Sequence, residues 1–339
     1  MTNNIAINGR CFSRRVTGVE RYAREISKRL TSSRIIQPKN NLGRVAGNLW
    51  EQIILPTQIK QNEILWSPAN AGPWLFRNQV ITIHDASVFD HPEWFKPSFA
   101  AWTQLSWKIL AKRVKAIITV SNYSCERLMF HLKISGEKIH VIPNGVGEPF
   151  QPQSNKTVRE MKRKYDLNKP YFLFVGTIEP RKNLAGLIEA FTKSNQSTHN
   201  LVIAGEKGRV FANSISRGMS VPRAQSLGYV PDTDLPALYS GADAVVVPSL
   251  YEGFGMTALE AMACGAPVIA SNTTSFPEVT GDAAIPINPN NAEEIKNAIF
   301  QISENSQLAN NLRERGLKRA AQFTWEESAR KTQLLLESL

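Results

Sequence analysis

The sequence is poor in the residues and motifs on which several large protein classes depend. Its 339 residues include three cysteines, which lie too far apart for a CxxC pair, and five histidines without an HExxH pair. No apolar run approaches the roughly 18 residues of a membrane-spanning helix. The first predicted strand, at 5–8, is not followed by the GxGxxG of a dinucleotide-binding turn. These absences argue against a structural metal site, a disulfide framework, a membrane span and a nicotinamide-dependent oxidoreductase.

Acidic residues are scarce in the first part of the chain. Lys and Arg outnumber Asp and Glu by 20 to 10 over residues 1–150, whereas the remainder holds 20 against 19, so nearly all of the net charge of +11 lies in the first part. Such an excess suits an anionic partner, such as a membrane surface, a lipid phosphate or nucleic acid. A generally basic solvated surface explains it equally well.

The N-terminus carries no targeting signal. Residues 1–4 lead straight into the first predicted strand, without the basic and then apolar segments of a secretory leader. We therefore expect a cytoplasmic protein, and the charge distribution leaves open a peripheral position on the inner face of the cell membrane.

Apolar runs rich in β-branched residues alternate with amphipathic stretches, which is the pattern of α/β domains with parallel sheets. The predicted strands of the first part are 5–8, 64–66, 80–83, 116–120 and 140–142, and its predicted helices are 19–30, 99–112 and 123–132. The predicted strands of the second part are 171–175, 201–204, 226–230, 244–248 and 268–270, and its predicted helices are 184–193, 235–240, 256–263 and 292–304. The segment 31–48 is expected to be irregular.

A chain of this length usually exceeds one hydrophobic core, so two domains are expected. The polar, proline-containing stretch 150–157 has no period and is predicted to be the linker. One domain then covers 1–150 and the other 151–324, with a final helix at about 325–339 predicted to pack back on the first. Because ligands of open sheets lie beyond the carboxyl ends of the strands, a deep cleft between the facing domains is the expected active site.

The most informative segment follows the predicted strand 244–248. Its loop carries Glu252 and Gly255, and a helix is predicted to begin at Met256. Glycine lets backbone amides approach a ligand, and a helix N-terminus favours negative charge. Glu260 falls within an apolar helical stretch, where a carboxylate needs a partner; the alternative is a solvated helix residue. Carboxylates accept hydrogen bonds from vicinal hydroxyls, so one glutamate is predicted to hold a sugar and the other a ribose.

A second block follows the predicted strand 171–175. Its turn begins with Gly176 and places Arg181 and Lys182 directly before a predicted helix. Arg offers a planar fork of donors and Lys a point charge, a combination suited to the oxygens of a diphosphate. Cations at a helix start oppose the helix dipole, so an anionic ligand explains them better than a solvated pair does.

The spacing of Glu252 and Glu260, an E-x7-E with Gly-Phe-Gly between them, resembles the retaining glycosyltransferases of family 4, which have the GT-B fold of two Rossmann-like domains. The resemblance spans most of the chain. It implies that Glu252 contacts the hydroxyls of the donor sugar and Glu260 the ribose diol. It also implies that the amides of Phe254, Gly255 and Met256 hold the sugar and the distal phosphate.

The resemblance assigns further roles in the turns that follow the strands. It implies that Arg181 and Lys182 neutralise the departing diphosphate. In the family, the backbone at the position of Val230 contacts the edge of the base and the residue at Leu235 packs on it, while Lys207 is placed as a phosphate or base contact. The donor-binding residues implied outside the glutamate block are Gly18, Gly176, Thr177, Lys207, Val230 and Leu235.

Two polar residues, His84 and Asp85, follow the predicted strand 80–83. A histidine at such a place is usually a core residue, but the family has one at this strand end, near the transferring sugar and the acceptor. The resemblance therefore implies a catalytic role for His84, with Asp85 orienting it or touching the acceptor. Residues 17–21 resemble the family's first loop, although many relatives have two consecutive glycines where this chain has Gly18 alone.

The run Asp232-Thr233-Asp234 spells the DxD with which transferases of another fold hold a metal. Because it directly precedes the predicted helix 235–240, we interpret it as a helix cap and expect no metal and no cofactor.

Together these features predict a metal-independent hexosyltransferase that retains configuration and acts by positioning and charge stabilisation. Similarity around residues 17–21 and 80–90 favours bacterial mannosyltransferases of polysaccharide biosynthesis, with GDP-mannose as donor and a saccharide or lipid-linked saccharide as acceptor. UDP- or ADP-glucose is the alternative donor.

Rival classes explain fewer of the motifs. A GT-B epimerase shares the expected fold, as does a phosphorylase with a lysine-bound pyridoxal cofactor. A non-catalytic module for anionic lipid or nucleic acid explains the basic first part only, and no nucleic-acid partner is expected. Segment 94–125 has no acidic residue and mixes Lys and Arg with Trp and Leu. It suits either a membrane interface or a helix buried on one side and solvated on the other.

Overall fold

The computed structural model describes residues 4–13, 16–40, 42–194, 198–206 and 223–339. Contacts within the chain divide it into two compact units. The first comprises Met1–Pro92, Pro97–Gly145 and Thr324–Leu339, and the second comprises Glu93–Lys96 and Val146–Phe323. Among the described residues, no helix is both long and apolar enough to cross a membrane.

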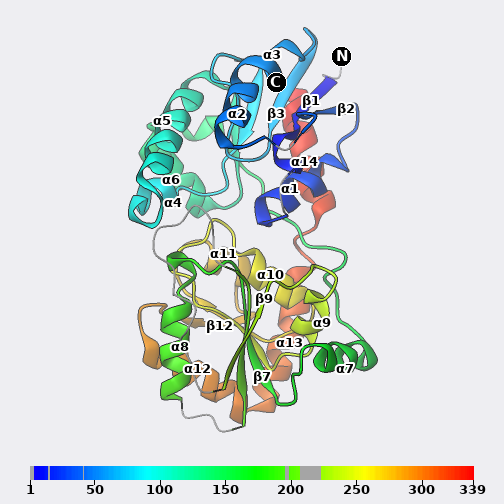
Figure 1. The fold of residues 1–339 in the computed structure, drawn as a ribbon, viewed down its shortest axis with the longest axis vertical. Helices are drawn as coiled ribbons and strands as arrows, with labels where there is room; N and C mark the ends of the chain where they lie inside the picture. Colours follow the sequence, from blue (N-terminus) through cyan, green and yellow to red (C-terminus); the bar gives the residue numbers. More distant parts are fainter. Residues whose placement is uncertain (1–3, 14–15, 41, 195–197, 207–222) are drawn as a thin grey trace. The chain divides into compact units, whose positions relative to one another are not determined.

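The first unit is built on a parallel six-stranded sheet in the order β2-β1-β3-β4-β5-β6, of which Figure 1 labels β1, β2 and β3. Its strands are β1 (Asn4–Asn8), β2 (Ser33–Ile36), β3 (Glu63–Ser67), β4 (Gln79–Thr82), β5 (Ala116–Thr119) and β6 (Ile139–Val141). Its helices are α1 (Gly18–Ser27), α2 (Arg44–Leu49), α3 (Leu55–Thr57), α4 (Ser87–Asp90), α5 (Pro97–Arg113), α6 (Asn122–Leu132) and α14 (Trp325–Ser338). A π-helical stretch, Trp50–Ile54, joins α2 to α3.

The second unit repeats this plan with a parallel sheet in the order β12-β11-β10-β7-β8-β9. Its strands are β7 (Tyr171–Val175), β8 (Asn200–Ala204), β9 (Ala224–Gly228), β10 (Ala244–Val247), β11 (Val268–Ser271) and β12 (Ala284–Ile287). Its helices are α7 (Asn155–Lys164), α8 (Leu184–Lys193), α9 (Leu235–Ser240), α10 (Met256–Ala263), α11 (Phe276–Thr280), α12 (Ala292–Glu304) and α13 (Ser306–Ala320). Its core is a cluster in which strand residues such as Phe172 and Val246 pack against Phe191 of α8 and Ile299 of α12.

Residues 31–48 are not irregular, contrary to the sequence-based expectation, because they contain β2 and the start of α2. The prediction was wrong for two physical reasons. Strand β2 lies at the edge of the sheet, so only Ile36 of its four residues is buried and no apolar run marks it. Helix α2 carries exposed apolar residues on its outer side, which obscures the helical period.

Helices α4, α7, α11 and α13 were also not predicted, and further differences lie at element boundaries and sheet edges. The stretch 150–157, predicted to be a linker, lies within the second unit, and α7 begins inside it at Asn155. The strand predicted at 226–230 runs from 224 to 228. Strand β12 was missed because it is an edge strand that contains Pro286, a residue that weakens any strand pattern.

The last helix, α14, belongs to the first unit, where it lies beside α1 (red and dark blue in Figure 1). Its Trp325 ring lies 6.3 Å from the ring of the buried Tyr22, and Ser328 Oγ donates a hydrogen bond of 2.6 Å to the carbonyl oxygen of Pro143. The contact depends on Gly145, because a Cβ atom there would lie 2.2 Å from the backbone nitrogen of Trp325. Only glycine lets the two backbone segments approach this closely.

Substitution Gly145→Ala should therefore destabilise the first unit. The added methyl group has to displace backbone rather than a flexible side chain, and overpacking of this kind costs about 1–3 kcal/mol. Denaturant unfolding measures the change. The matched control is Gly18→Ala in the first turn of α1, where a Cβ atom meets nothing within 4 Å and stability should be kept. Equal stability of the two variants would contradict this account of α14 docking.

Candidate active site

The second sheet reverses its strand order between β7 and β10. From β7 the sheet continues through β8 to β9, and from β10 it continues in the other direction through β11 to β12. Such a switch point is where open parallel sheets bind ligands. The turn after β7 and the loop after β10 meet there, since the amide of Leu250 donates a 2.7 Å hydrogen bond to the carbonyl oxygen of Arg181. Both sequence-predicted blocks are thus attached to one another.

An ion cluster occupies this point. Glu252, only 7 % exposed, receives hydrogen bonds from Lys182 Nζ at Oε1 and from Arg181 Nη1 at Oε2, the latter at 3.3 Å. Ser249 Oγ donates a further bond of 3.1 Å to Oε1. The three residues to which the sequence assigned charge and sugar contacts therefore lie together, and their charges compensate one another.

A second carboxylate, Glu179, completes the cluster and was not identified from the sequence. It is buried and accepts a hydrogen bond from Arg181 Nε. Burial raises the pKa of Glu179, and the nearby charges of Arg181 and Lys182 offset this only in part. The signal was present in the sequence, because an acid two residues before a pair of cations suggests that it holds one of them.

The pKa of Glu252 moves in the opposite direction. Burial alone would raise it, but the charges of Lys182 and Arg181 outweigh burial and hold the pKa of Glu252 below its usual range. Hydrogen bonds from Lys182 and Ser249 add to the effect. Glu252 is therefore an ionised acceptor, as contacts to sugar hydroxyls require.

The backbone of Glu252 is held from the turn that follows β11. Its amide donates a hydrogen bond of 3.4 Å to Thr274 Oγ1, and Ser275 Oγ donates one of 2.9 Å to its carbonyl oxygen. Thr274 has φ +60°, a conformation that is unusual for a β-branched residue. Neither residue was expected from the sequence, since a positioning contact across 22 residues leaves no local pattern.

The loop then enters α10 through Gly255, whose φ of +98° suits glycine. A Cβ atom at this position would also lie 3.0 Å from the ring of Phe276. The amides of Phe254, Gly255 and Met256 donate no hydrogen bond to any residue in the described part of the chain. Unpaired amides at a helix start form an anion-binding arrangement.

Glu260 lies further along α10 and is buried, so it is not the solvated helix residue of the alternative interpretation. The hydroxyl of the buried Tyr239, in α9, donates a 3.1 Å hydrogen bond to Glu260 Oε2. A buried carboxylate at this position has the partner that its apolar surroundings demand.

The turns after β7 and β8 also touch. A Cβ atom on Gly205 would lie 1.8 Å from the carbonyl oxygen of Gly176, so this contact requires glycine at Gly205. Gly176 in turn has φ +152° and donates its amide to Ala204. Thr177 follows in the same turn and is half-buried. Lys207 lies outside the described residues.

Val230 and Leu235 are both buried, the first shortly after β9 and the second at the start of α9. Asp234 stands at the N-cap position of α9, but its side chain does not cap the helix. Its Oδ2 instead accepts hydrogen bonds of 2.6 Å from Lys164 and 2.5 Å from Tyr165. The capping interpretation of the DxD run was therefore wrong, because the Asp234 carboxylate is hydrogen-bonded to residues at the end of α7 instead of to the start of α9.

No group of three or more His, Cys, Asp or Glu side chains in the described ranges is arranged to hold a metal ion.

His84 follows β4 in the first unit and is buried. Its Nε2 lies 2.9 Å from the carbonyl oxygen of Pro68, so Nε2 carries the proton and donates. Burial lowers the pKa of His84, and the hydrogen bond to Pro68 and the charge of Asp85 offset this only in part. The ring also packs edge-on against Tyr22 at 4.8 Å. His84 is thus a neutral imidazole in a fixed orientation.

Asp85 and Gly18 each lie beside the start of a helix in the first unit. Asp85 Oδ1 accepts hydrogen bonds from the amide and the hydroxyl of Ser87, the first residue of the short helix α4, at 2.8 and 2.5 Å. Gly18 is exposed in the first turn of α1, where Thr17 and Glu20 form a capping box.

A further buried cluster at the switch point of the first sheet was not expected. That point lies between β1 and β3, where Asn8 Nδ2 donates to Glu51 Oε1 at 2.7 Å and to Ser67 Oγ at 3.3 Å. Arg10 Nη1 donates to Glu51 Oε2 at 2.8 Å. Glu51 belongs to the π-helical stretch, which brings it to a cation 41 residues away in the chain.

Removing Lys182 should make the stability of the second unit depend differently on pH. The folded-state pKa of Glu252 is depressed, so its stabilisation is present above the ordinary carboxyl pKa of 4.5 and is lost as pH falls through the folded value. In Lys182→Ala the buried carboxylate has lost its main partner, which should cost about 3 kcal/mol at neutral pH. The deficit should shrink on acidification, as Glu252 takes up a proton.

Unfolding curves of the variant and the unchanged protein across the acidic range test this. Lys193→Ala on α8 is the control, because Lys193 and Glu189 form a solvent-exposed pair and should contribute little at any pH. If Lys182→Ala and Lys193→Ala show the same pH dependence, the ion cluster does not stabilise the unit as described.

Comparison with known proteins agrees with this geometry. Residues 157–319 match the model of the family described as glycosyl transferases group 1, and residues 62–147 match glycosyltransferase family 4. The O-antigen chain mannosyltransferase B of Escherichia coli is 31% identical, over 94% of this chain and 95% of its own length. The serotype-specific mannosyltransferase WbdA of the same organism is also 31% identical over 77% of this chain, which spans 33% of that longer protein.

Among solved structures, that of Anabaena Alr3699/HepE in complex with UDP and glucose has a TM-score of 0.76. The match covers 99% of this chain and 100% of that one at 15% identity, which supports the fold. The chain therefore belongs to the group 1 glycosyltransferases of family 4, and its two Rossmann-like units have the GT-B fold.

Proposed function

We propose that this glycosyltransferase moves a mannosyl residue from GDP-mannose to a saccharide or lipid-linked saccharide, with retention of configuration and without a metal. The observation that carries the donor site is the buried cluster of Arg181, Lys182 and Glu252 beside the unpaired amides at the start of α10. The names of the relatives, two of them mannosyltransferases, support the sugar.

The cluster suits a substrate that carries both a diphosphate and a sugar. Two cations and two carboxylates compensate one another in the structure described. A diphosphate supplies oxygens that compete with Glu252 and Glu179 for the cations. The hydroxyls of the sugar then supply donors that replace those cations at Glu252. When the nucleotide sugar binds, the four charged residues of the cluster thus exchange one set of polar partners for another. This limits the free-energy cost of keeping their charges away from water.

Departure of the diphosphate concentrates negative charge on the leaving oxygen. Arg181, Lys182 and the amides of Phe254, Gly255 and Met256 are all donors, and donors fixed beforehand stabilise developing charge most effectively. The two side chains and the helix start supply this compensation, so the proposed reaction needs no metal. Glu252 holds the sugar while the bond to phosphate breaks.

His84 contributes as a neutral, oriented ring. Its Nε2 proton is held by Pro68, and burial keeps the pKa low, so the ring does not add a positive charge beside the sugar. We assign it a contact to the transferred sugar or to the acceptor. The acceptor is assigned only by chemical class, as a saccharide hydroxyl.

A glucosyl donor is the second candidate. The solved structure of Alr3699/HepE contains UDP and glucose, and its fold match covers 99% of this chain. The base of the nucleotide distinguishes the two candidates.

Thermal stabilisation by GDP, UDP, ADP, dTDP and CDP, each with and without EDTA, tests the donor. GDP should raise the unfolding temperature selectively and equally in both conditions. A ligand that binds only the folded state adds about 2.7 kcal/mol at a hundred times its dissociation constant. A selective shift with UDP or ADP would favour a glucosyl donor over GDP-mannose. Loss of the shift with EDTA would show that donor binding requires a metal. No shift with any nucleotide would contradict the assignment of a donor site.

The double variant Arg181→Ala, Lys182→Ala should nearly abolish turnover of GDP-mannose. Removing a single preorganised donor to a developing oxyanion costs about 10²–10³ in rate, so the loss of both should exceed that. Lys193→Ala on α8 is the control and should turn over normally. Lys182→Arg keeps the charge next to Glu252 and separates loss of catalysis from loss of folding, since it should retain both stability and part of the rate. A double variant that folds and reacts at near-normal rate would contradict the assignment.

A further inference from the structure

Exposed apolar side chains gather in one part of the first unit. Seven of them lie on α2, the π-helical stretch, the loop between β3 and β4, and α5, namely Val45, Leu49, Ile53, Ile54, Leu75, Trp102 and Leu105. Single exposed apolar residues are ordinary, but a contiguous group marks an interaction site.

The helical stretch 44–57 has apolar residues on both sides. Its inner side is fixed, since Trp50 and Leu55 are packed in a buried cluster and Glu51 pairs with Arg10. On its outer side, Val45, Leu49 and Ile53 recur every four residues and are 73, 56 and 59 % exposed. A helix at the surface of a soluble protein normally carries polar residues there. Folding of the unit gives no reason for this second apolar face.

Trp74 joins this helical face to α5. Its amide donates a 2.8 Å hydrogen bond to Gln52 Oε1, and its indole Nε1 donates one of 2.9 Å to Ser106 Oγ. Its ring also lies 4.9 Å from that of Trp102. The next residue, Leu75, is 79 % exposed. One tryptophan therefore connects the apolar residues of both helices into a single surface, called here the 45–113 face.

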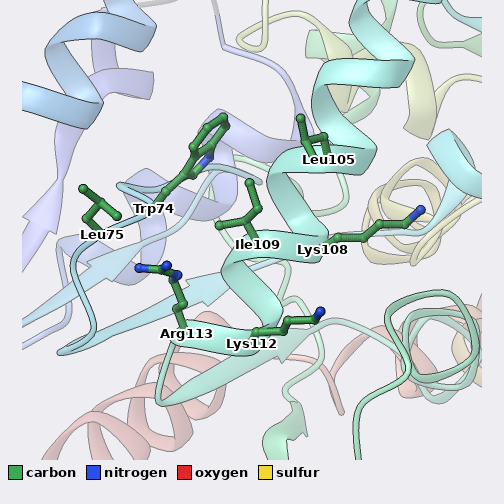
Figure 2. Close-up of a pocket in the computed structure, with 7 residues that line it drawn as sticks. All are labelled: Trp74, Leu75, Leu105, Lys108, Ile109, Lys112 and Arg113. Carbon is green, nitrogen blue, oxygen red and sulfur yellow. The ribbon is translucent and has the colours of Figure 1, made fainter.

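Between the β3–β4 loop and α5, the face contains an open groove of about 440 Å³. Figure 2 shows Trp74 and Leu75 on one side of it and Leu105 and Ile109 of α5 on the other, with Arg113 below them. The lining is mainly apolar, and the cations stand at its edge.

The two segments that contain the helices of this face are almost free of Asp and Glu. From residue 94 to 125 the sequence has none, and from 31 to 62 it has only Glu51, which is buried against Arg10. Cations are present and exposed, at Arg77, Lys112 and Arg113. The face therefore combines aliphatic side chains with positive charge and no exposed acid from either segment.

We propose that the 45–113 face binds the surface of an anionic lipid bilayer. A bilayer interface accepts aliphatic and aromatic side chains at the level of the acyl boundary and attracts Lys and Arg to its phosphates. Nucleic acid offers phosphates but no apolar layer for Leu75 and Ile53. A second copy of the chain presents the same positive charge and is repelled. The proposal does not depend on the donor assigned above.

Flotation with phosphatidylcholine vesicles, with and without phosphatidylglycerol, tests membrane binding by the 45–113 face. No nucleotide sugar or acceptor saccharide is added. The protein should float with the anionic vesicles and much less with the neutral ones. Each basic residue near an anionic surface strengthens attachment about fivefold, so Lys112→Gln, Arg113→Gln should weaken it about 25-fold. Leu49→Gln, Ile53→Gln, Leu75→Gln should weaken it at least tenfold, because these side chains are exposed and leave the core intact.

Matched controls lie on the second unit. Lys156→Gln, Arg159→Gln on α7 removes two exposed charges, and Phe300→Gln on α12 removes an exposed ring. Both should float like the unchanged protein. The proposal is overturned if the protein binds anionic and neutral vesicles equally or if the face variants float normally. It is also overturned if the control variants lose as much vesicle binding as the face variants. Nucleotide-induced stabilisation of the same variants should be unchanged, which separates this test from that of the donor site.

Discussion

The ion pair between Lys182 and Glu252 joins two loops that follow neighbouring strands of the second sheet, and both side chains are nearly withdrawn from water. Such a pair is costly to desolvate unless its geometry is good and further hydrogen bonds complete it. Arg181, Ser249 and the backbone bond between Leu250 and the Arg181 carbonyl supply this completion. The pairing of β7 with β10 brings the loops together in the first place, so the cluster depends on the switch of strand order.

The same constraint explains why the ion cluster holds two carboxylates. Arg181 and Lys182 without Glu179 and Glu252 would be two adjacent, half-buried cations with nothing to offset their mutual repulsion. The two glutamates keep the site charged but compensated. Their pKa values move apart, with Glu252 held low by the cations and Glu179 raised by burial. Glu179 is thus the first of the two to take up a proton as pH falls, which leaves the cations less compensated.

The sequence predicted those parts of the molecule whose cause is local. Buried parallel strands are continuous apolar runs, and β7, β8, β10 and β11 were found for that reason. The glutamates and cations were found because each stands in a short motif at a strand end. What was missed depends on distant partners. Asp234 accepts hydrogen bonds from Lys164 and Tyr165 instead of capping α9. The backbone of Glu252 is positioned by Thr274. Glu51 lies in a π-helical stretch and pairs with Arg10. Edge strands such as β2 pair with only one neighbouring strand and are partly exposed. Their sequences therefore lack the continuous apolar run that marks a buried strand.

The charge asymmetry of the chain has a cause that the total charge conceals. The first 150 residues and the other 189 each hold 20 basic residues, but the first part has 10 acidic residues and the second 19. The first part is therefore positive through both a higher density of Lys and Arg and a loss of carboxylates. The loss is concentrated in segments 31–62 and 94–125, which contain α2 and α5 and their exposed apolar side chains. The single acid kept in the first of these segments, Glu51, points inward, where Arg10 neutralises it.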